Sequence, residues 1–372
     1  MRLRWALTTA GLIFIAIVAG GCGRDDNAQL VLGAVLPMTG NAAKYGEQMK
    51  EGVDLAVEQI NAAGGINGKR VRVLVEDGQA DAKTSIAAFR KLVSQDHVPG
   101  VVSGFSGVIL ALSPIATETT TVLLNCGATS PEIEGASPFV FSDIPNAKQE
   151  ATFLADVVFE KFGVRKVAIF WQNNDAGLGM QQLFQQRFEA LGGAVVAKES
   201  QEPGASDFRA QLNKLKEANP QAIFMPTYSK EFGLAIKQAR ELGLTCQFFG
   251  YAATEVQEMI DLAGSAAEGV VYSYYAYDQR TPTPAARRFL DAYQKKYAHS
   301  PNLYSATFYD GILLLADGLA KGHTSGQALR TYLHEMKGFE GSSGVIVFTE
   351  TGTVQSALRL KTVKDGKFVE YK

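Results

Sequence analysis

The sequence predicts an α/β protein in which parallel sheets carry helices on both faces. From Gln29 onward, short runs rich in β-branched residues alternate with longer amphipathic runs, the rhythm of repeated strand–helix–strand units. The rhythm occurs in two series, which a proline-containing stretch at residues 137–145 separates. The chain has 372 residues, a length typical of two or three domains. We therefore expect two lobes of similar architecture.

The first series supplies four predicted strands and two predicted helices. Val53, Ala56 and Ile60 share one face of the first helix, which Gly64 and Gly65 terminate. The predicted strands are residues 29–36, 71–76, 98–103 and 122–124, the second helix covers residues 108–118, and residues 125–138 are expected to form a loop.

The second series begins at Lys166 and repeats the pattern. Its predicted strands are residues 166–171, 194–198, 222–225 and 247–249, and its helices are residues 178–191, 208–218 and 232–242. The chain then shows two long helical patterns at residues 284–298 and 305–320, a glycine-rich hairpin at residues 341–352 and a final strand at residues 357–363. These last elements must complete one lobe or the other.

The first 21 residues predict an export signal. Arg2 and Arg4 precede an apolar stretch shorter than the ~20 residues that a membrane-spanning helix needs, so a permanent anchor helix is the weaker alternative. Small residues then precede Cys22, as in a lipoprotein cleavage site, although Ala19 stands where leucine is usual. We expect Cys22 to become the acylated first residue and residues 22–28 to form a tether. The folded part would then be periplasmic or otherwise extracytoplasmic, and only its lipid would contact the membrane.

Cys126 and Cys246 are the other two cysteines of the chain. An exported protein could join them in a disulfide. Each of them ends an apolar run, however, which favours a buried small side chain.

Composition and motifs argue against several classes of function. Basic residues number 36 and acidic residues 38, and no basic stripe stands out, so nucleic acid is not an expected partner. The chain lacks a G-x-x-x-x-G-K phosphate loop, and Gln182 stands where a dinucleotide fingerprint starting at Gly177 needs its third glycine. The four histidines indicate neither a zinc site nor a catalytic triad. We expect no enzymatic activity, no cofactor and no metal.

Three polar, glycine-containing loops follow predicted strands of the first series, where open α/β sheets bind ligands. One loop leads to Tyr45, the second includes Ser106 at the start of a helix, and the third begins at Gly127. The unpaired N–H groups and the dipole of a helix N-terminus favour a carboxylate, so Ser106 and the N–H groups beside it form a candidate anion site. A simple helix cap is the alternative role for Ser106.

Short motifs along the chain are shared with a known family. They are Thr39-Gly40, Tyr45-Gly46, Gly52, Ile60-Asn61-Ala62-Ala63-Gly64-Gly65-Ile66-Asn67-Gly68, Gly127-Ala128-Thr129-Ser130-Pro131, Asn174-Asp175 with Gly177, Asp207-Phe208, and Gln238-Ala239-Arg240 with Gly243-Leu244. The run that begins at Ile60 is the most specific of them. In these motifs the chain resembles the branched-chain amino-acid-binding proteins of bacterial ABC importers, and the similarity covers residues 29–372.

The resemblance implies a type I periplasmic binding protein, in which two Rossmann-like αβ lobes are joined by three hinge strands and close on a ligand. The hinge crossings would lie near Ile144, Tyr274 and Val354. The lobes would comprise residues 29–145 plus 276–353 and residues 146–275 plus 354–372.

The resemblance also implies roles for individual residues. Ser106 would bind the ligand carboxylate, and Gly127 and Thr129 would hold the amino group or another polar end. Tyr45 and Tyr228 would line the side-chain pocket from opposite lobes.

Two departures from the family pattern leave the ligand open. Ala176 stands where the family commonly has tyrosine, and Gly250-Tyr251-Ala252 stands where an acid often binds the ligand ammonium. A buried ammonium without a carboxylate is costly, so Asp175, our first choice, or Glu255 could replace that acid.

Ligands without an amine are the alternative. Trp171, Tyr251 and the tyrosine-rich residues 272–277 could stack on an aromatic acid. Residues 272–277 also fit an ordinary sheet core or a hinge.

The sequence thus favours a receptor that captures a small carboxylate-bearing solute, preferably an amino acid of the branched-chain or neutral class, and delivers it to an ABC permease and its ATPase. Closure of the hinge around the ligand would be the mechanism. We expect a monomer. The alternatives are a receptor for aromatic acids or amides and a ligand-sensing subunit of a signalling system.

Overall fold

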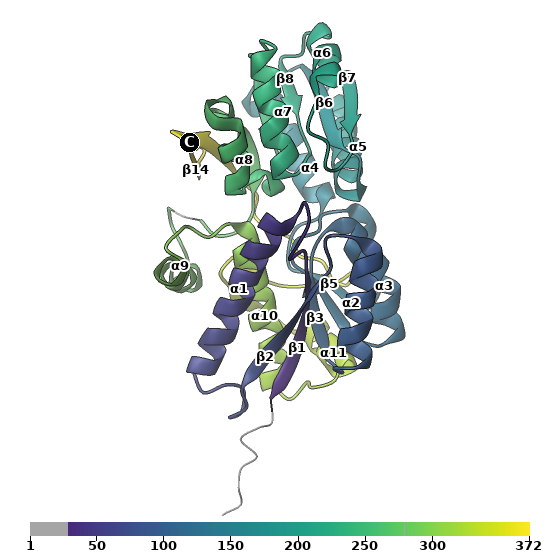
Figure 1. The fold of residues 1–372 in the computed structure, drawn as a ribbon, viewed down its shortest axis with the longest axis vertical. Coiled ribbons are helices and arrows are strands. Elements are labelled where there is room, and N and C mark those ends of the chain that lie inside the picture. The colour runs from purple at the N-terminus through teal and green to yellow at the C-terminus, as the bar shows by residue number, and fades with distance from the viewer. Residues whose placement is uncertain (1–28, 279) are drawn as a thin grey trace, which may run out of the picture.

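The computed structural model describes residues 29–278 and 280–372, which form two lobes stacked end to end (Figure 1). The predicted export signal at residues 1–21, the lipidation site Cys22 and the tether at residues 22–28 lie outside the described residues. Within the described part of the chain, no helix has both the length and the apolar character that crossing a membrane requires.

The sheet of the first lobe has five parallel strands in the order β2-β1-β3-β4-β5. Its strands are β1 (Leu30–Leu36), β2 (Val71–Asp77), β3 (Gly100–Ser103), β4 (Val122–Asn125) and β5 (Val140–Ser142). Its helices are α1 (Ala43–Ala62), α2 (Ala82–Ser94), α3 (Ser106–Glu118), α10 (Leu303–Ala320) and α11 (Gly326–Glu335). The chain moves from β1 to β2 in one direction and to β3 in the other, so right-handed crossovers place α1 on one face of the sheet and α2 and α3 on the other. Helix α10, from the far end of the chain, packs along α1.

The sheet of the second lobe has the order β14-β13-β10-β9-β8-β6-β7. Five of its strands are parallel, whereas β13 pairs antiparallel with β10 and β14 pairs antiparallel with β13. The strands are β6 (Lys166–Gln172), β7 (Ala194–Gln201), β8 (Ala222–Phe224), β9 (Gln247–Gly250), β10 (Val271–Tyr274), β13 (Arg359–Lys364) and β14 (Lys367–Glu370). The helices are α4 (Ala147–Asp156), α5 (Asp175–Ala190), α6 (Arg209–Glu217), α7 (Ser229–Glu241) and α8 (Gln257–Ala263).

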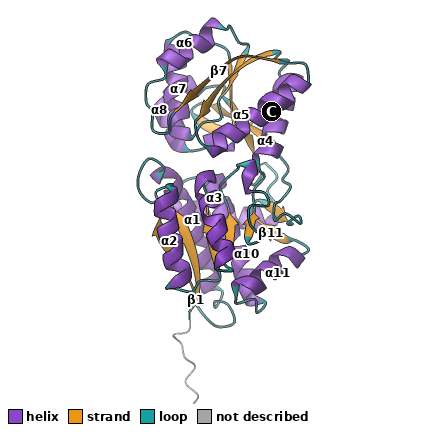
Figure 2. Ribbon diagram, turned by 90° about the vertical axis from the view of Figure 1, so that its right-hand side faces the viewer, coloured by secondary structure: helices purple, strands orange, loops and turns teal. Residues whose placement is uncertain are grey.

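The chain passes between the two lobes three times, after β5, after β10 and after a small hairpin (Figure 2). The hairpin consists of β11 (Phe339–Gly341) and β12 (Gly344–Ile346), and helix α9 (Pro284–Tyr297) follows the second crossing. This is the two-lobed α/β fold that the sequence predicts. Parallel strands point their carboxyl ends toward the gap between the lobes, where open sheets of this kind bind ligands.

Several elements are absent from the sequence prediction, namely α2, α4, α8, α11, β5 and β14, whereas β10 falls in the stretch that was considered as sheet core. Strand β5 has only three residues and lies inside the stretch that separates the two series. The buried face of α4 consists largely of alanine, which gives a weak apolar period. Short strands and helix faces made of alanine thus give little of the periodic pattern of large apolar side chains on which the prediction depends.

The two cysteines of the described chain are free thiols. Cys126 is buried and Cys246 is half-buried. The expectation of small buried side chains is therefore confirmed for Cys126 in full and for Cys246 in part, and the alternative of a disulfide is wrong.

Candidate ligand-binding site

A small cavity lies between the two lobes. Its cavity volume is about 10 Å³, roughly the space that one water molecule needs, so the lobes or their side chains must move apart to admit a solute. Its lining residues are Ser106, Gly127, Thr129 and Tyr304 from the first lobe and Ala176, Tyr228, Tyr251, Ala253 and Tyr275 from the second lobe and its crossing. Residues of both lobes therefore meet at this cavity.

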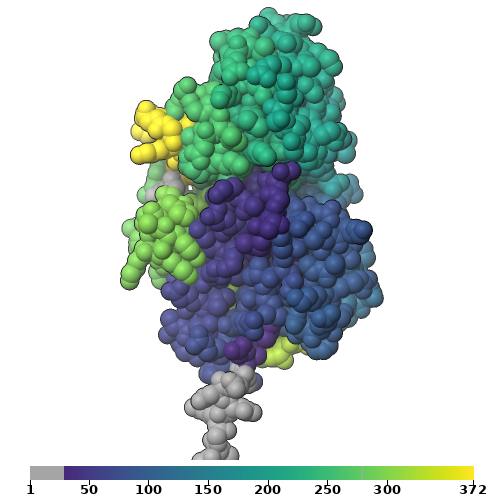
Figure 3. All heavy atoms as spheres, in the orientation of Figure 1, coloured from purple at the N-terminus to yellow at the C-terminus, as the bar shows by residue number. Residues whose placement is uncertain are grey.

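A wider cleft shares Ser106, Ala176 and Tyr228 with the cavity. Exposed residues such as Gly40 and Asp175 line its rim. On the outside of the molecule, the purple surface near the start of α1 touches the green surface of the second lobe (Figure 3). The cavity is therefore covered by contacts between the lobes.

The start of α3 forms one wall of the cavity. Its N-cap residue, Phe105, has a φ of 69° and provides no side-chain cap, so the N–H groups of the first turn lack both a cap and an intrahelical acceptor. A left-handed backbone is strained for phenylalanine, and such strain is concentrated at functional sites. Ser106 is buried, and its hydroxyl accepts a hydrogen bond from the N–H of Ser130 at 3.1 Å. The alternative role of Ser106 as a helix cap is therefore wrong.

Asn125 fixes the loop that forms the adjoining wall. Its side-chain oxygen accepts hydrogen bonds from the N–H groups of Gly127 and Ala128, at 3.2 and 2.8 Å, and its amide group donates to the carbonyl of Ala128 at 2.8 Å. A Cβ atom at Gly127 would lie 3.3 Å from the ring of Tyr304, so glycine allows this ring to approach the loop. These hydrogen bonds of Asn125 hold the loop with Gly127 and Thr129 beside Ser106.

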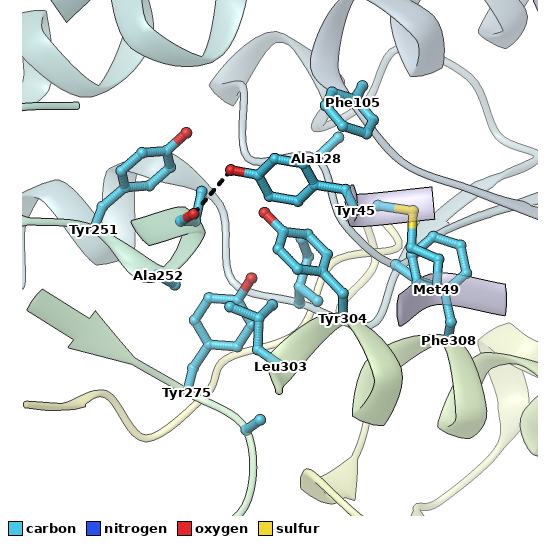
Figure 4. Packing of buried hydrophobic residues seen from close by; sticks show 14 of the residues in the cluster. Tyr45, Met49, Phe105, Ala128, Tyr251, Ala252, Tyr275, Leu303, Tyr304 and Phe308 are labelled. Carbon is cyan, nitrogen blue, oxygen red and sulfur yellow. Dashed lines mark hydrogen bonds between the residues drawn. The ribbon is translucent and has the colours of Figure 1, made fainter. Parts of the chain in front are cut away.

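Tyr45, on α1, connects the two lobes. Its hydroxyl donates to the carbonyl of Ala253 at 3.0 Å, shown in Figure 4, and accepts from the N–H of Ser229 at 2.7 Å. Its ring meets Phe105 and Tyr228 edge to face, with centroids 5.7 and 5.8 Å apart. Burial raises the pKa of the Tyr45 hydroxyl far above its usual value, which keeps it neutral. The lobes are thus held in a closed arrangement.

Three further tyrosines direct hydroxyl groups into the cavity. Tyr251 follows β9, Tyr275 follows β10 and Tyr304 lies in the first turn of α10, and their hydroxyls point toward one another in Figure 4. Within the described chain these three hydroxyls make no hydrogen bond. Burial raises the pKa of all three well above the usual value. They are neutral groups that can donate to or accept from a ligand.

The two acids considered from the sequence lie outside the cavity. The buried carboxylate of Glu255 accepts from the ammonium of Lys361 at 2.6 Å and from the hydroxyl of Tyr272 at 2.7 Å, so it is already neutralised and the suggestion that it binds a ligand amine does not hold. Asp175 is exposed at the rim of the cleft, and a Cβ atom at Gly107 would lie 3.0 Å from its carboxylate. Asp175 therefore faces the start of α3 across the gap.

A third acid, Glu150 on α4, is fully buried behind the loop that follows β9. Its Oε1 accepts from the N–H of Ala252 at 2.8 Å and from the hydroxyl of Ser273, while its Oε2 is buried and finds no hydrogen-bond partner among the described residues. Burial raises the pKa of Glu150 to about 7, although both hydrogen bonds oppose the rise. No sequence motif indicates this residue.

The aromatic residues considered for stacking divide into two groups. Tyr251 and Tyr275 line the cavity, whereas Trp171 lines neither the cavity nor the cleft. Tyr272 is bound to Glu255, and the ring of Tyr274 lies 4.2 Å from the ammonium of Lys361. The tyrosine-rich stretch is therefore mostly sheet core, and only Tyr275 belongs to the site.

Comparison with known proteins places the chain in a family. The family profile described as periplasmic binding protein matches residues 29–367. The chain belongs to this family. Within the described residues, no cluster of histidine, cysteine and acidic side chains could hold a metal ion.

This periplasmic binding protein has named relatives over nearly its whole length. It is 26% identical over 358 residues to the leucine-, isoleucine-, valine-, threonine-, and alanine-binding protein of Pseudomonas aeruginosa. The alignment covers 95% of this chain and 93% of the relative. It is 27% identical over 348 residues to Leu/Ile/Val-binding protein homolog 3 of Brucella melitensis, with 92% and 93% covered.

Solved structures agree with these relatives. The branched-chain amino acid transporter substrate binding protein of Streptococcus pneumoniae, in complex with isoleucine, matches with a TM-score of 0.87 and 28% identity over 92% of this chain and 98% of that one. A solute binding protein of an ABC transporter from Rhodopseudomonas palustris, in complex with 3,4-dihydroxy benzoic acid, matches with a TM-score of 0.83 and 25% identity over 93% and 97%. These proteins bind solutes and are not enzymes, and this binding protein is of the branched-chain amino-acid ABC-transporter type.

In this binding protein the structure brings most of the predicted site residues together. Tyr45 lines the wider cleft, and Asp175 stands at the rim of that cleft. Sequence reasoning missed Tyr304 and Glu150, which come from a helix start and an unpredicted helix and carry no local motif, whereas Tyr275 belongs to the tyrosine-rich stretch that was considered for stacking. The predicted residues that line the cavity are Ser106, Gly127, Thr129, Tyr228 and Tyr251.

Proposed function

We propose that this protein captures a neutral amino acid of the branched-chain type and delivers it to an ABC permease and its ATPase. The observation that carries the proposal is the uncapped start of α3, where Ser106 and unpaired N–H groups stand beside Gly127 and Thr129 in a small cavity between the lobes. The relatives from Pseudomonas aeruginosa and Streptococcus pneumoniae, which bind such amino acids, support this assignment.

The carboxylate of the ligand is assigned to the start of α3. The hydroxyl of Ser106, the N–H groups of the first turn and the positive end of the helix dipole all favour a negative charge there. Among the described residues, no arginine or lysine lines this cavity. The hydroxyl of Thr129 and the carbonyl of Gly127 are placed to accept from the amino group, and the rings of Tyr45 and Tyr228 receive the side chain.

Hinge closure is the proposed mechanism. We assign residues 29–145 plus 276–353 to one lobe and residues 146–275 plus 354–372 to the other. With these bounds Thr129 and Tyr228 line the cavity from opposite lobes. A ligand that contacts both walls binds the closed form more tightly than the open form and shifts the population toward it. The permease would recognise the closed form.

The tether is a separate part of the proposal. Acylation of Cys22 would hold a monomer at the outer side of the membrane within reach of the permease. Mass spectrometry of the protein from its native membrane should find lipid on Cys22, and an unmodified N-terminus beyond Cys22 would contradict the assignment.

A ligand screen tests the amino-acid assignment. Thermal unfolding of the protein should shift upward with leucine, isoleucine or valine, and the shift should grow with concentration above the dissociation constant. Absence of a shift with these amino acids, together with a shift with benzoate-like acids, would overturn the assignment.

Aromatic acids are the second candidate. The hydroxyls of Tyr251, Tyr275 and Tyr304 could bind ring substituents, and the neighbour from Rhodopseudomonas palustris holds 3,4-dihydroxy benzoic acid. The same screen separates the two candidates because benzoates lack the ammonium group.

A further inference from the structure

Glu150 is a buried acid, and only one of its two carboxylate oxygens is hydrogen-bonded within the described chain. It lies in the first turn of α4, with one carboxylate oxygen held by the N–H of Ala252 and the hydroxyl of Ser273. The other oxygen is buried, and no residue that the structure describes forms a hydrogen bond with it. A buried polar atom left in this state is costly, and it calls for a partner.

The unpartnered carboxyl lies next to the ligand cavity. Ala252, which donates to Glu150, lies between Tyr251 and Ala253, and both of these residues line the cavity. Burial raises the pKa of Tyr251 and of Tyr275, and the negative charge of Glu150 raises both further, so the carboxyl stands close to both hydroxyls. Glu150 itself does not line the cavity, and the backbone of Ala252, to which it is bonded, joins it to the cavity wall.

No protein cation neutralises Glu150 within the described chain. Lys148 on the same helix is exposed, and Arg187 on the neighbouring α5 is paired with Asp156 at 2.6 Å. Lys361, on the strand beside β10, is taken by Glu255.

Two other acids, Asp175 and Asp143, lie on elements near Glu150. Asp175, at the start of α5, is exposed at the rim of the cleft. The buried Asp143, at the first crossing, acts on Tyr275 from the other side. Within the described residues, Glu150 thus has no cationic partner.

We propose that Glu150 supplies the negative charge opposite the ammonium group of the ligand, in place of the acid that is absent at Ala252. The inference rests on the proposed function, because it requires a ligand that carries an amine. A buried ammonium and a buried carboxylate are each unfavourable alone and stabilise each other when paired. The hydroxyls of Tyr251 and Tyr275 complete the hydrogen bonds of this end of the ligand.

A proton accompanies this mode of binding. In the ligand-free protein Glu150 titrates near pH 7, so below that pH it is largely protonated. An ammonium group beside it favours the carboxylate, and the proton then leaves to solvent. Binding should therefore release up to one proton per ligand at pH 6, and affinity should rise about tenfold between pH 6 and pH 8.

Isothermal titration of L-leucine into the full chain measures both effects. Titrations at pH 6 in two buffers of different ionisation enthalpy give the number of protons released by the wild-type protein, without any substitution. Glu150→Gln should abolish the release and weaken leucine binding at pH 8 by roughly a hundredfold, because the buried ammonium loses its counter-charge.

Asp310→Asn is the matched control. Burial also raises the pKa of Asp310, to about 6, but its carboxylate is held by the N–H groups of Ser342 and Ser343 in the first lobe. This variant should keep the proton release. Circular dichroism and thermal unfolding establish that both variants fold.

The outcomes separate the inference from the proposed function. If leucine binds to the wild-type protein without proton release and with equal affinity at pH 6 and pH 8, Glu150 has no role toward the amine and the amino-acid assignment stands. If leucine, isoleucine and valine all fail to bind, the proposed function is overturned and the role of Glu150 falls with it.

Discussion

The two walls of the cavity are built in different ways. The first-lobe wall, Ser106, Gly127 and Thr129, comes from two loops that directly follow β3 and β4, and its polar groups are backbone N–H groups and hydroxyls. The second-lobe wall, Tyr228, Tyr251 and Tyr275 with Glu150 behind it, comes from four separate segments and contains a buried ionisable acid.

The difference assigns separate tasks to the two walls. Neutral donors at a helix N-terminus recognise a carboxylate at any pH near neutrality, so the first-lobe wall sets the class of ligand. A buried acid that titrates near pH 7 distinguishes ligands with an amine from those without one. The second-lobe wall therefore sets selectivity and the response to pH.

The largest expected effect tests whether the buried, ionised carboxylate of Glu150 lowers the stability of the folded protein. The pKa of Glu150 is raised in the folded protein from 4.5 to about 7, so its contribution to stability is complete below pH 4.5 and is lost as pH rises through 7. The difference amounts to about 3 kcal/mol. Urea unfolding of ligand-free protein at pH 5 and pH 8 should show a smaller loss of stability for Glu150→Gln than for the wild type. An identical loss in both proteins would mean that Glu150 ionises freely in the folded state.

The next effect tests the first-lobe wall. Ser106→Ala should weaken leucine binding by roughly 1 to 3 kcal/mol at every pH, because a charged acceptor loses one of its donors. Calorimetry at pH 6 and pH 8 measures the change. Ser113→Ala is the control, since that hydroxyl donates to the carbonyl of Ile109 within α3 and does not line the cavity. Unchanged affinity of Ser106→Ala would remove this residue from the site.

A smaller effect concerns the contact that joins the walls. Tyr45→Phe removes the hydrogen bonds to Ala253 and Ser229 and should weaken ligand binding by about 1 kcal/mol, because the closed form loses two contacts between the lobes. Small-angle scattering should show a larger radius of gyration for the ligand-free variant. Tyr309→Phe, which loses a hydroxyl bound to Gln59 within the first lobe, serves as control. Equal scattering of Tyr45→Phe and wild type would show that Tyr45 does not hold the lobes together.

The smallest effect is expected at the rim. Asp175→Asn should change leucine affinity by less than about 0.5 kcal/mol, because an exposed carboxylate interacts weakly through solvent. A thermal-shift titration with leucine is sufficient to see this. Loss of the response would restore Asp175 as the acid that binds the amine and would contradict the assignment to Glu150.

The first-lobe wall can be predicted from the sequence to a greater extent than the second-lobe wall. The alternation of strands and helices and the motif from Ile60 to Gly68 are local, so the fold class and the first-lobe wall could be predicted. Glu150 has no local signal, because α4 shows mainly alanine on its buried face and Glu150 reads as an ordinary charged residue of a helix. Tyr304 and Tyr275 reach the cavity only through tertiary packing.

The fate of Glu255 shows the limit of reasoning from distance along the chain. It lies within a few residues of the position where the family acid is expected, yet the structure pairs it with Lys361 from the last segment of the protein. Only the antiparallel register of β10 and β13 brings these residues together, since Tyr272 faces Lys361 in that pair of strands. No sequence pattern near Glu255 indicates this partner.

The most direct test compares two ligands that differ only in the amine. L-leucine and 4-methylpentanoate share the carboxylate and the side chain, and calorimetry with the full chain at pH 8 gives a dissociation constant for each. Because removal of one member of a buried charge pair costs about 2–5 kcal/mol, leucine should bind at least about thirtyfold more tightly. Equal affinities would contradict the claim that the start of α3 binds the carboxylate while Glu150 supplies the charge opposite the amine.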